Sequence, residues 1–565
     1  MHTYFEIEPD VTTPVAETTV NVALRLKEMA RRQPYRRAVV FPAARDANGR
    51  VAYSHLTFRQ LDRESDCFAR GLASVGIGRG TRTILMVRPS LELFALTYAM
   101  LKVGAVFVMV DPGMGVRRML ACLRESRAQA MIGVSAAHAL RTLAPRYFKG
   151  VKTAVTIGRR WFWRGPTLKE IRPLPWQPFP VADTDPDEMA AILFTTGSTG
   201  AAKGAVYTHG TFDAQVRLIR DRFDITPDDI DLPTFPLFSL FDAALGMTAV
   251  IPDMDPTRPA DVDPRKVVEA VVNQGVTNMF ASPALLNTVG RFGEENGIKL
   301  PSLKRVISAG APAAPANIAR FAGMLDEGAE IHTGYGATEA MPVSSFGSKE
   351  ILGETAARTA QGFGICVGRP IQELDVRIIR ISDEPIQEWS DDLEVAEDGE
   401  IGEIVVRGAI VTRRYFQRPR QDALSKIRQG EDIWHRMGDL GWMDRKGRIW
   451  FCGRKSHRVI TPHGTLFTIP CEAIFNNHPA VFRSALVGLG QPPRQRPVIC
   501  IELEPDHRKD DPEKLHRELM ALGAGHVLTE KIETLLFHPA FPVDIRHNSK
   551  IFREKLAEWA ERKVG

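Results

Sequence analysis

Glycines, hydroxyl side chains and a lysine are concentrated in one short run, FTTGSTGAAKG, from Phe194 to Gly204. The run follows the apolar residues 190–194, so we expect a strand that ends in a glycine-rich loop. Glycine lets backbone N–H groups approach an anion closely, and hydroxyl and ammonium groups can bind phosphate oxygens. The candidate phosphate-binding residues are Thr195, Thr196, Gly197, Ser198, Thr199, Gly200 and Lys203. The run lacks the Walker spacing, because Gly204 stands where Ser or Thr should follow the lysine. The residue types alone also fit an ordinary polar loop.

Four further runs follow in an order that resembles the AMP-forming acyl-adenylate synthetases, the superfamily of acyl-CoA ligases, luciferases and peptide-synthetase adenylation domains. These runs are YGATE at Tyr335–Glu339, HRMGDLG at His435–Gly441, GRKSHRV at Gly453–Val459 and RHNSK at Arg546–Lys550. Upstream, KVGAVFVMVDP at Lys102–Pro112 is similar to the family's KAGAxYVPLDP segment. The resemblance covers nearly the whole chain.

The resemblance implies that ATP converts a carboxylate into an acyl-AMP with release of pyrophosphate, and it gives each matched residue a part. Residues 195–200 would surround the β- and γ-phosphates, Thr338 would contact the α-phosphate, and Glu339 would help to bind Mg²⁺, which prefers oxygen ligands. The adenosine would be held by Tyr335, Gly336, Gly310, Ala311, Pro312, Asp439 and Arg454: Tyr335 would stack on adenine and Asp439 would bind the ribose hydroxyls. Each match alone is more typical of a structural residue, whereas the ordered set favours function.

Lys550 is the predicted catalytic lysine. It closes RHNSK, which is similar to the family's RxxxGK except that Ser549 replaces glycine. In the family this lysine reaches the carboxylate and the α-phosphate, and a compact ammonium group suits that task. A lysine so near a C-terminus is otherwise an ordinary surface residue.

The segment PLFSLFDAALG, Pro236–Gly246, departs from the family's pattern. Ser239 replaces a histidine that gates many acyl-CoA ligases, and Asp242 adds a carboxyl group beside an apolar pocket in which Phe241 and Phe280 are further candidates. Asp242 could bind a substrate amine or hydroxyl, or cap the following helix, and its residue type favours the cap. Asp242 and His332 are also the candidates for a base that accepts a proton from a substrate hydroxyl.

The predicted hinge is Ser456, where the family usually has Asp or Lys. The loop from Val459 to Gly464 is one residue longer than usual, and HGTLFTIPCE replaces the common GxxIxPxEIE. In the family this loop remodels the site for thioester formation after the small domain rotates. These departures leave adenylation intact and put transfer to CoA in doubt.

With these departures in view, the whole chain most resembles the olefin-biosynthesis β-lactone synthetases. The resemblance implies a long-chain 2-alkyl-3-hydroxy acid whose β-hydroxyl attacks the activated acyl carbon and expels AMP, together with partner enzymes of the same pathway. Three alternatives stay open: a long-chain acyl-CoA ligase, an enzyme that activates amino acids for a separate carrier protein, and an inactive homologue that only binds nucleotide.

The pattern of the elements predicts an α/β fold with a β-rich subdomain. Strand and helix patterns alternate through residues 20–150 and 190–340, which favours mostly parallel sheets covered by helices. Leu91–Val103 is predicted as a buried helix capped by Ser90, between strands at Thr83–Val87 and Ala105–Val110. Residues 374–408 are predicted to form short strands. We expect a large N-terminal domain over residues 1–453 and a small, mobile α+β lid over residues 454–565.

The bulk properties exclude several classes of protein. A chain of 565 residues with 44% hydrophobic and 25% charged residues is typical of a soluble multidomain protein. The net charge of +5 does not support nucleic-acid binding. No signal peptide or membrane-spanning run is recognisable. The six scattered cysteines lack CxxC spacing, which favours free thiols in the cytoplasm.

The segment Arg159–Trp176 combines basic and aromatic residues. Such a mixture can lie at a membrane surface or at an interface with a partner. We favour aromatics that pack on the domain beneath over membrane contact, and a role in partner binding or substrate entry stays open.

Overall fold

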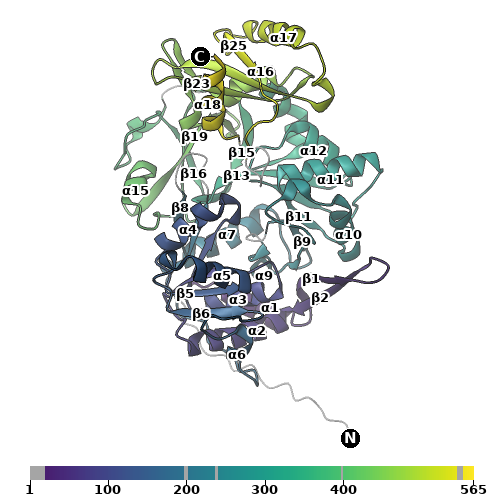
Figure 1. The fold of residues 1–565 in the computed structure, drawn as a ribbon, viewed down its shortest axis with the longest axis vertical. Helices are drawn as coiled ribbons and strands as arrows, with labels where there is room; N and C mark the ends of the chain where they lie inside the picture. The colour runs from purple at the N-terminus through teal and green to yellow at the C-terminus, as the bar shows by residue number, and fades with distance from the viewer. Residues whose placement is uncertain (1–18, 196–201, 236–238, 396–398, 544–550, 565) are drawn as a thin grey trace.

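A six-stranded sheet carries the two strands that flank the glycine-rich run, in a computed structural model of the chain (Figure 1). The structure describes residues 19–195, 202–235, 239–395, 399–543 and 551–564. The strand order is β6-β5-β3-β4-β7-β8, with parallel neighbours except for β8, which is antiparallel to β7. The bounds are β3 Arg82–Met86, β4 Val106–Val110, β5 Ala130–Val134, β6 Thr153–Ile157, β7 Met189–Thr195 and β8 Lys203–Thr208.

A fourteen-stranded sheet carries the motifs between residues 335 and 454. Its order is β16-β17-β19-β20-β15-β14-β13-β12-β11-β9-β10-β1-β2, and β18 pairs with β19. The strands from β13 to β1 along this order are parallel, and the others are antiparallel. The bounds are β1 Arg37–Arg45, β2 Val51–Thr57, β9 Ile230–Pro233, β10 Thr248–Val250, β11 Asn278–Ala281, β12 Arg305–Ser308, β13 Glu330–Ala337, β14 Ala340–Gly347, β15 Ile365–Pro370, β16 Asp375–Ile379, β17 Gly402–Arg407, β18 Lys426–Gln429, β19 Asp432–Met443 and β20 Ile449–Arg454.

Helices fill the space between the two sheets and cover their outer faces. The central core contains side chains from α1, α2, α3, α7 and α9, whereas α4 and α5 pack on the six-stranded sheet and α10, α11 and α12 on the larger one. The bounds are α1 Ala23–Arg32, α2 Phe58–Ser74, α3 Leu91–Lys102, α4 Val116–Glu125, α5 Ser135–Leu143, α7 His209–Arg222, α9 Asp242–Leu245, α10 Pro264–Gln274, α11 Pro283–Glu295 and α12 Pro315–Ala322.

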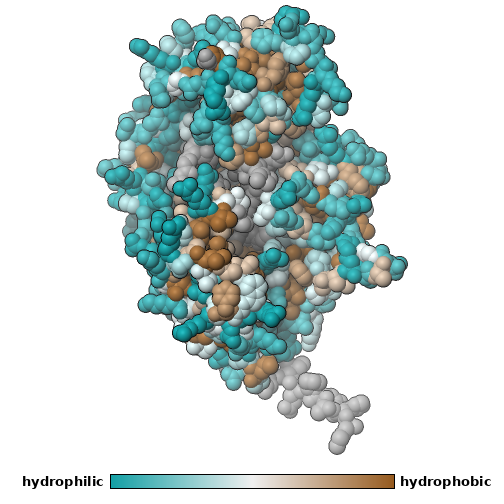
Figure 2. Space-filling view, in the orientation of Figure 1, coloured by the Kyte–Doolittle hydropathy of each residue, from teal (hydrophilic) through white to brown (hydrophobic). Residues whose placement is uncertain are grey.

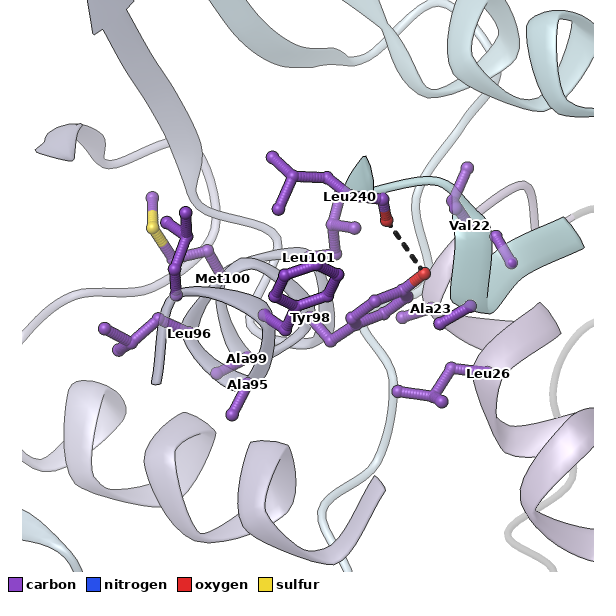
Figure 3. Packing of buried hydrophobic residues seen from close by; sticks show 14 of the residues in the cluster. Val22, Ala23, Leu26, Ala95, Leu96, Tyr98, Ala99, Met100, Leu101 and Leu240 are labelled. Carbon is purple, nitrogen blue, oxygen red and sulfur yellow. Dashed lines mark hydrogen bonds between the residues drawn. The ribbon is translucent and has the colours of Figure 1, made fainter. Parts of the chain in front are cut away.

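Helix α3 forms because its sequence is apolar on nearly every side and its first turn is capped. The Ser90 hydroxyl accepts a hydrogen bond from the backbone N–H of Leu93 at 3.3 Å. Figure 3 shows Tyr98 of this helix among apolar neighbours, with its hydroxyl directed at the backbone of Leu240. The Tyr98 hydroxyl donates to the Leu240 carbonyl at 3.1 Å. The core thereby holds the segment that leads into Phe241 and Asp242.

The two sheets are joined next to the glycine-rich run. Residues 414–416 run along the free edge of β8, where Ala205 and Tyr415 form an isolated bridge. The backbone N–H of Val206 donates to the Arg414 carbonyl at 3.1 Å, and that of Phe416 donates to the Gly204 carbonyl at 2.8 Å. Strand β8 is therefore held from both sides.

The C-terminal part has its own sheet, β23-β24-β25, and its own apolar clusters. Figure 1 shows it above the rest of the molecule, in yellow. Helix α16 packs against β20 and α14, and the Asn477 side chain donates to the Ala360 carbonyl at 2.8 Å. The bounds are α14 Ala356–Ala360, β21 Val459–Thr461, β22 Gly464–Leu466, α16 Thr468–Phe475, β23 Val481–Leu489, β24 Arg496–Leu503, α17 Pro512–Ala524, β25 Thr534–Phe537 and α18 Arg553–Val564.

The predicted α/β fold is confirmed, including the capped helix α3, its flanking strands and the short strands β16 and β17. In the segment Arg159–Trp176, Trp163 is buried and its indole N–H donates to the Thr156 hydroxyl at 2.9 Å, so this aromatic packs as expected. Trp161 and Phe162, in contrast, are 55% and 73% exposed. Within the described ranges, no helix is long and apolar enough to cross a membrane.

Candidate active site

A cavity of about 2170 Å³ lies between the large part and the C-terminal part, and Figure 2 shows the molecule hollowed there. Its walls include nearly all of the described residues that the sequence singled out. These are Lys203, Phe241, Phe280, Gly310, Ala311, Pro312, Tyr335, Gly336, Thr338, Glu339, Asp439, Arg454 and Ser456. Residues as far apart in the sequence as Lys203 and Ser456 therefore meet at one site.

Some predicted residues fall outside the part of the chain that the structure describes. These are Thr196, Gly197, Ser198, Thr199, Gly200 and Lys550. Thr195 is the last residue of β7 and pairs with Lys203, the first residue of β8, so both ends of the glycine-rich run lie at one end of this strand pair. On the C-terminal side, Ile551 and Arg553, which follow Lys550, line the cavity.

Tyr335, Asp439 and Arg454 form a connected cluster in the cavity wall. The Tyr335 hydroxyl donates to Asp439 Oδ2 at 2.8 Å, and Arg454 Nη1 lies 2.9 Å from Asp439 Oδ1. Asp439 and Arg454 are neighbours because β19 and β20 pair them in register. Burial, together with the carboxylate of Asp439, raises the pKa of Tyr335 well above its ordinary value, so this hydroxyl stays a donor.

Glu339 is held by two residues from the segment that follows β17. Its carboxylate accepts a hydrogen bond from the Tyr415 hydroxyl, and its backbone carbonyl accepts one from the Thr412 N–H at 2.8 Å. The neighbouring Thr338 carbonyl accepts from the Tyr207 hydroxyl of β8. The turn between β13 and β14 is thus fixed by β8 and by the segment that follows β17. The sequence analysis did not single out Tyr207, Thr412 or Tyr415, and no local pattern marks them.

The apolar side of the cavity contains the two predicted phenylalanines, Phe241 and Phe280. The Phe241 ring packs against Phe212 of α7, with ring centroids 5.2 Å apart. His332 is not among the lining residues. Its ring packs edge-on against Phe223 at 5.5 Å, and burial lowers its pKa.

Asp242 is buried beneath this wall, with 3% exposure, and does not line the cavity. It is the first residue of α9 but its side chain makes no cap hydrogen bond, so the helix-cap reading is wrong. Its neighbour is Asp231 of β9, which also accepts a hydrogen bond from the Asn278 side chain. Burial raises the pKa of both carboxyl groups, that of Asp231 to about 7. The pair therefore holds a proton in the interior.

The segment around Ser456 changes its contacts from one part of the molecule to the other. Before Ser456, Lys455 Nζ lies 3.1 Å from the buried Glu403 carboxylate of β17. After it, His457 Nε2 lies 3.5 Å from Glu554 of α18. Ser456 itself is exposed at the cavity wall, whereas the strand pair β21–β22 contributes no lining residue.

The fold is shared with solved structures of other proteins. The amide bond synthetase McbA from Marinactinospora thermotolerans superposes with a TM-score of 0.75, covers 95% of this chain and 99% of that chain, and is 21% identical. This likeness shows that the chain shares the fold of that enzyme.

The comparisons of sequence are more specific. A model of the AMP-binding enzyme family matches residues 26–416. The olefin beta-lactone synthetase of Xanthomonas campestris is 46% identical over 550 residues, which is 96% of this chain and 98% of that protein. The olefin beta-lactone synthetase of Stenotrophomonas maltophilia is also 46% identical, over 96% of this chain and 98% of that protein. The chain belongs to the AMP-binding, AMP-forming enzyme family, and the resemblance inferred from its motifs is confirmed.

Proposed function

We propose that this protein activates a long-chain 2-alkyl-3-hydroxy acid with ATP and closes it to a β-lactone. Pyrophosphate and AMP are the other products. The observation that carries the proposal is 46% identity to two olefin beta-lactone synthetases over 96% of the chain. The described residues of the ordered motifs also meet at one cavity with an apolar side, which supports it.

In the first step, an oxygen of the substrate carboxylate attacks the α-phosphorus of ATP, and the bond to pyrophosphate breaks. We assign the β- and γ-phosphates to residues 195–200 and Lys203, and the α-phosphate to Thr338. Lys550 is assigned the contact with both the carboxylate and the α-phosphate. Fixed positive charges and donors stabilise the charge that develops during transfer.

The adenosine is assigned to the cluster on the opposite wall. Tyr335 offers a ring face to adenine, with Gly336 and residues 310–312 as its surroundings. Asp439 is assigned the ribose hydroxyls, and its ion pair with Arg454 orients its carboxyl group.

Glu339 fits the role of a Mg²⁺ ligand. Tyr415 bonds one of its two carboxylate oxygens, and the side chain lines the cavity. Among the described residues no group of three or more potential ligands could hold a metal alone. Mg²⁺ is usually held by one or two carboxylates together with substrate phosphates, which agrees with a single glutamate here. The metal, when bound, would neutralise charge on the phosphate oxygens.

In the second step, the β-hydroxyl oxygen attacks the acyl carbon and the bond to AMP breaks. An oriented group in the same molecule can have an effective concentration on the order of 10⁵ M, which offsets part of the strain of a four-membered ring. Neither Asp242 nor His332 lines the cavity, so we assign the hydroxyl proton to the departing phosphate group or to solvent. No acceptor other than the substrate is required.

Residues 454–565 are proposed to act as a lid that turns at Ser456, with the large domain ending at residue 453. The contacts on the two sides of this residue support the assignment. Arg454 and Lys455 form ion pairs with carboxylates of the large part, whereas His457 contacts Glu554 of α18. We also propose a cytoplasmic location, since all six cysteines are free and buried, and assembly with other enzymes of the same pathway.

The test is a reaction of the purified protein with ATP, Mg²⁺ and a synthetic 2-alkyl-3-hydroxy acid, with and without CoA. The products are followed by NMR at ambient temperature. A cyclic ester that forms equally without CoA is the expected result. A thioester that forms only with CoA would instead identify an acyl-CoA ligase, and nucleotide binding without pyrophosphate release would identify an inactive homologue.

A further inference from the structure

Lys426, the first residue of β18, is a buried lysine behind the phosphate end of the cavity. It is 7% exposed and is not among the lining residues. Its ammonium group donates to the Thr412 carbonyl and lies 3.4 Å from the Thr412 hydroxyl. It also lies 5.6 Å from the centroid of the Tyr415 ring. Within the described part of the chain no carboxylate forms an ion pair with it, although a buried charge without a counter-charge is costly.

Both contacts of Lys426 lead to Glu339. Thr412 donates its backbone N–H to the Glu339 carbonyl at 2.8 Å and its hydroxyl to the same oxygen at 3.2 Å. Tyr415 donates its hydroxyl to the Glu339 carboxylate. The ammonium group of Lys426 therefore fixes the two residues that together fix the backbone and the side chain of Glu339.

A second ammonium group approaches the same ring from the cavity. Lys203 Nζ lies 5.0 Å from the Tyr415 ring centroid, and both Lys203 and Tyr415 line the cavity. Each cation is attracted to the electron-rich face of the ring. Burial lowers the pKa of Lys426 to about 8, an effect that Glu339 and Asp422 oppose. A polyanion beside Lys203 would add negative charge in front of the two ammonium groups.

We propose that Lys426 is a positioning residue for the polyphosphate end of the nucleotide. It holds Thr412 and Tyr415, and through them Glu339, and it adds positive charge behind Lys203. The inference rests on the proposed function, because it needs ATP as the ligand of this cavity. It distinguishes ligands by their phosphates: ATP and pyrophosphate should depend on Lys426, whereas AMP, which lacks the β- and γ-phosphates, should not.

The experiment measures binding by calorimetry, without turnover, for ATP with Mg²⁺, pyrophosphate with Mg²⁺, and AMP. The variant is Lys426→Met, which keeps the length of the side chain and removes its charge. Lys446→Met is the matched control, because Lys446 is 58% exposed, pairs with Glu354 and is not among the lining residues. We expect Lys426→Met to weaken ATP and pyrophosphate at least about tenfold, to leave AMP within about twofold, and the control to bind all three normally.

Two results would overturn the inference. An equal loss of ATP and AMP affinity would show a structural role only, and unchanged ATP and pyrophosphate affinities would show no role. If Lys426→Met does not fold, the variants Lys426→Arg and Tyr415→Phe test the inference instead. Arginine should restore pyrophosphate binding, and Tyr415→Phe should weaken ATP in the presence of Mg²⁺ more than in its absence. Failure of the unmodified protein to bind any nucleotide would count against the proposed function instead.

Discussion

At the scale of single residues, tyrosine hydroxyls hold the acidic groups of the site. Tyr335 donates to Asp439 and Tyr415 donates to Glu339. Burial raises the pKa of both tyrosines, so both remain donors throughout the physiological range. A neutral tyrosine orients a carboxyl group without adding a counter-charge, and at Asp439 the counter-charge comes from Arg454 instead.

Lys550→Ala tests the predicted catalytic lysine. We expect ATP–pyrophosphate exchange to fall about a hundredfold or more, because a charge that follows the transferring phosphoryl group is lost. ATP binding should stay nearly unchanged, since the other nucleotide contacts remain. The control is Lys563→Ala, an exposed lysine at the end of α18. Normal exchange by Lys550→Ala would remove this residue from the mechanism.

Asp242→Asn tests the buried carboxyl pair through the pH dependence of stability. The folded-state pKa of Asp231 is raised from the usual 3.8 to about 7, so the folded protein keeps a proton that the unfolded chain releases. The stability that this proton contributes is full below pH 4 and is lost as pH rises towards 7. Burial and Asp231 also raise the pKa of Asp242, so the asparagine removes one of the two carboxyl groups that destabilise the folded protein as pH rises.

Urea unfolding at pH 5.5 and 7.5 measures this effect. Relative to the unmodified protein, Asp242→Asn should gain about 2 kcal/mol of unfolding free energy between the two pH values. If the unfolding free energies of the two proteins change by the same amount between these pH values, the pair does not titrate as a buried unit.

At the scale of elements, the start of α18 is fixed to α16 by an ion pair. Arg553 bonds both carboxylate oxygens of Glu472, at 2.5 and 3.0 Å, and both side chains are largely buried. Glu472 also accepts from the backbone N–H of Leu486 at 2.8 Å. This contact fixes the position of Arg553, which follows Lys550 by three residues in the sequence.

Arg553→Met should therefore destabilise the C-terminal part by about 3 kcal/mol, since it leaves a buried carboxylate without its counter-charge. Differential scanning calorimetry should show a lower first transition. The double variant Arg553→Met, Glu472→Gln should recover part of the loss, because glutamine is neutral and still accepts from Leu486. No recovery would mean that the arginine acts through packing.

Elements with a local signal were predictable, and contacts between distant elements were not. Ser90 and the apolar residues after it predict α3 because the cap and the helix are contiguous in sequence. Tyr415 and Glu339 are 76 residues apart, and nothing near either one marks the other as a partner. The residue type of Asp242 favours a helix cap, yet tertiary packing places it against Asp231 of strand β9. The wall residues of the cavity were recognisable only because their motifs resemble a family's.

At the scale of the whole molecule, the cavity has walls from both parts of the chain. A nucleotide that fills it should stabilise the large and small parts together. At a concentration one hundred times its dissociation constant, a ligand that binds only the folded state adds about 2.7 kcal/mol. Thermal unfolding with ATP, AMP and CoA should show upward shifts for the two nucleotides and none for CoA. A shift with CoA would favour the ligase alternative.

The backbone bonds between β8 and residues 414–416 also have a consequence for local opening. Val206 and Phe416 donate across the junction of the two sheets, from segments two hundred residues apart. Neither amide hydrogen can exchange with solvent unless the hydrogen bonds between β8 and residues 414–416 break. Their deuterium uptake should therefore be slow and matched, although one lies in a strand and the other in an irregular segment. The start of β8, which follows the glycine-rich run in the sequence, should therefore exchange only when the two sheets separate.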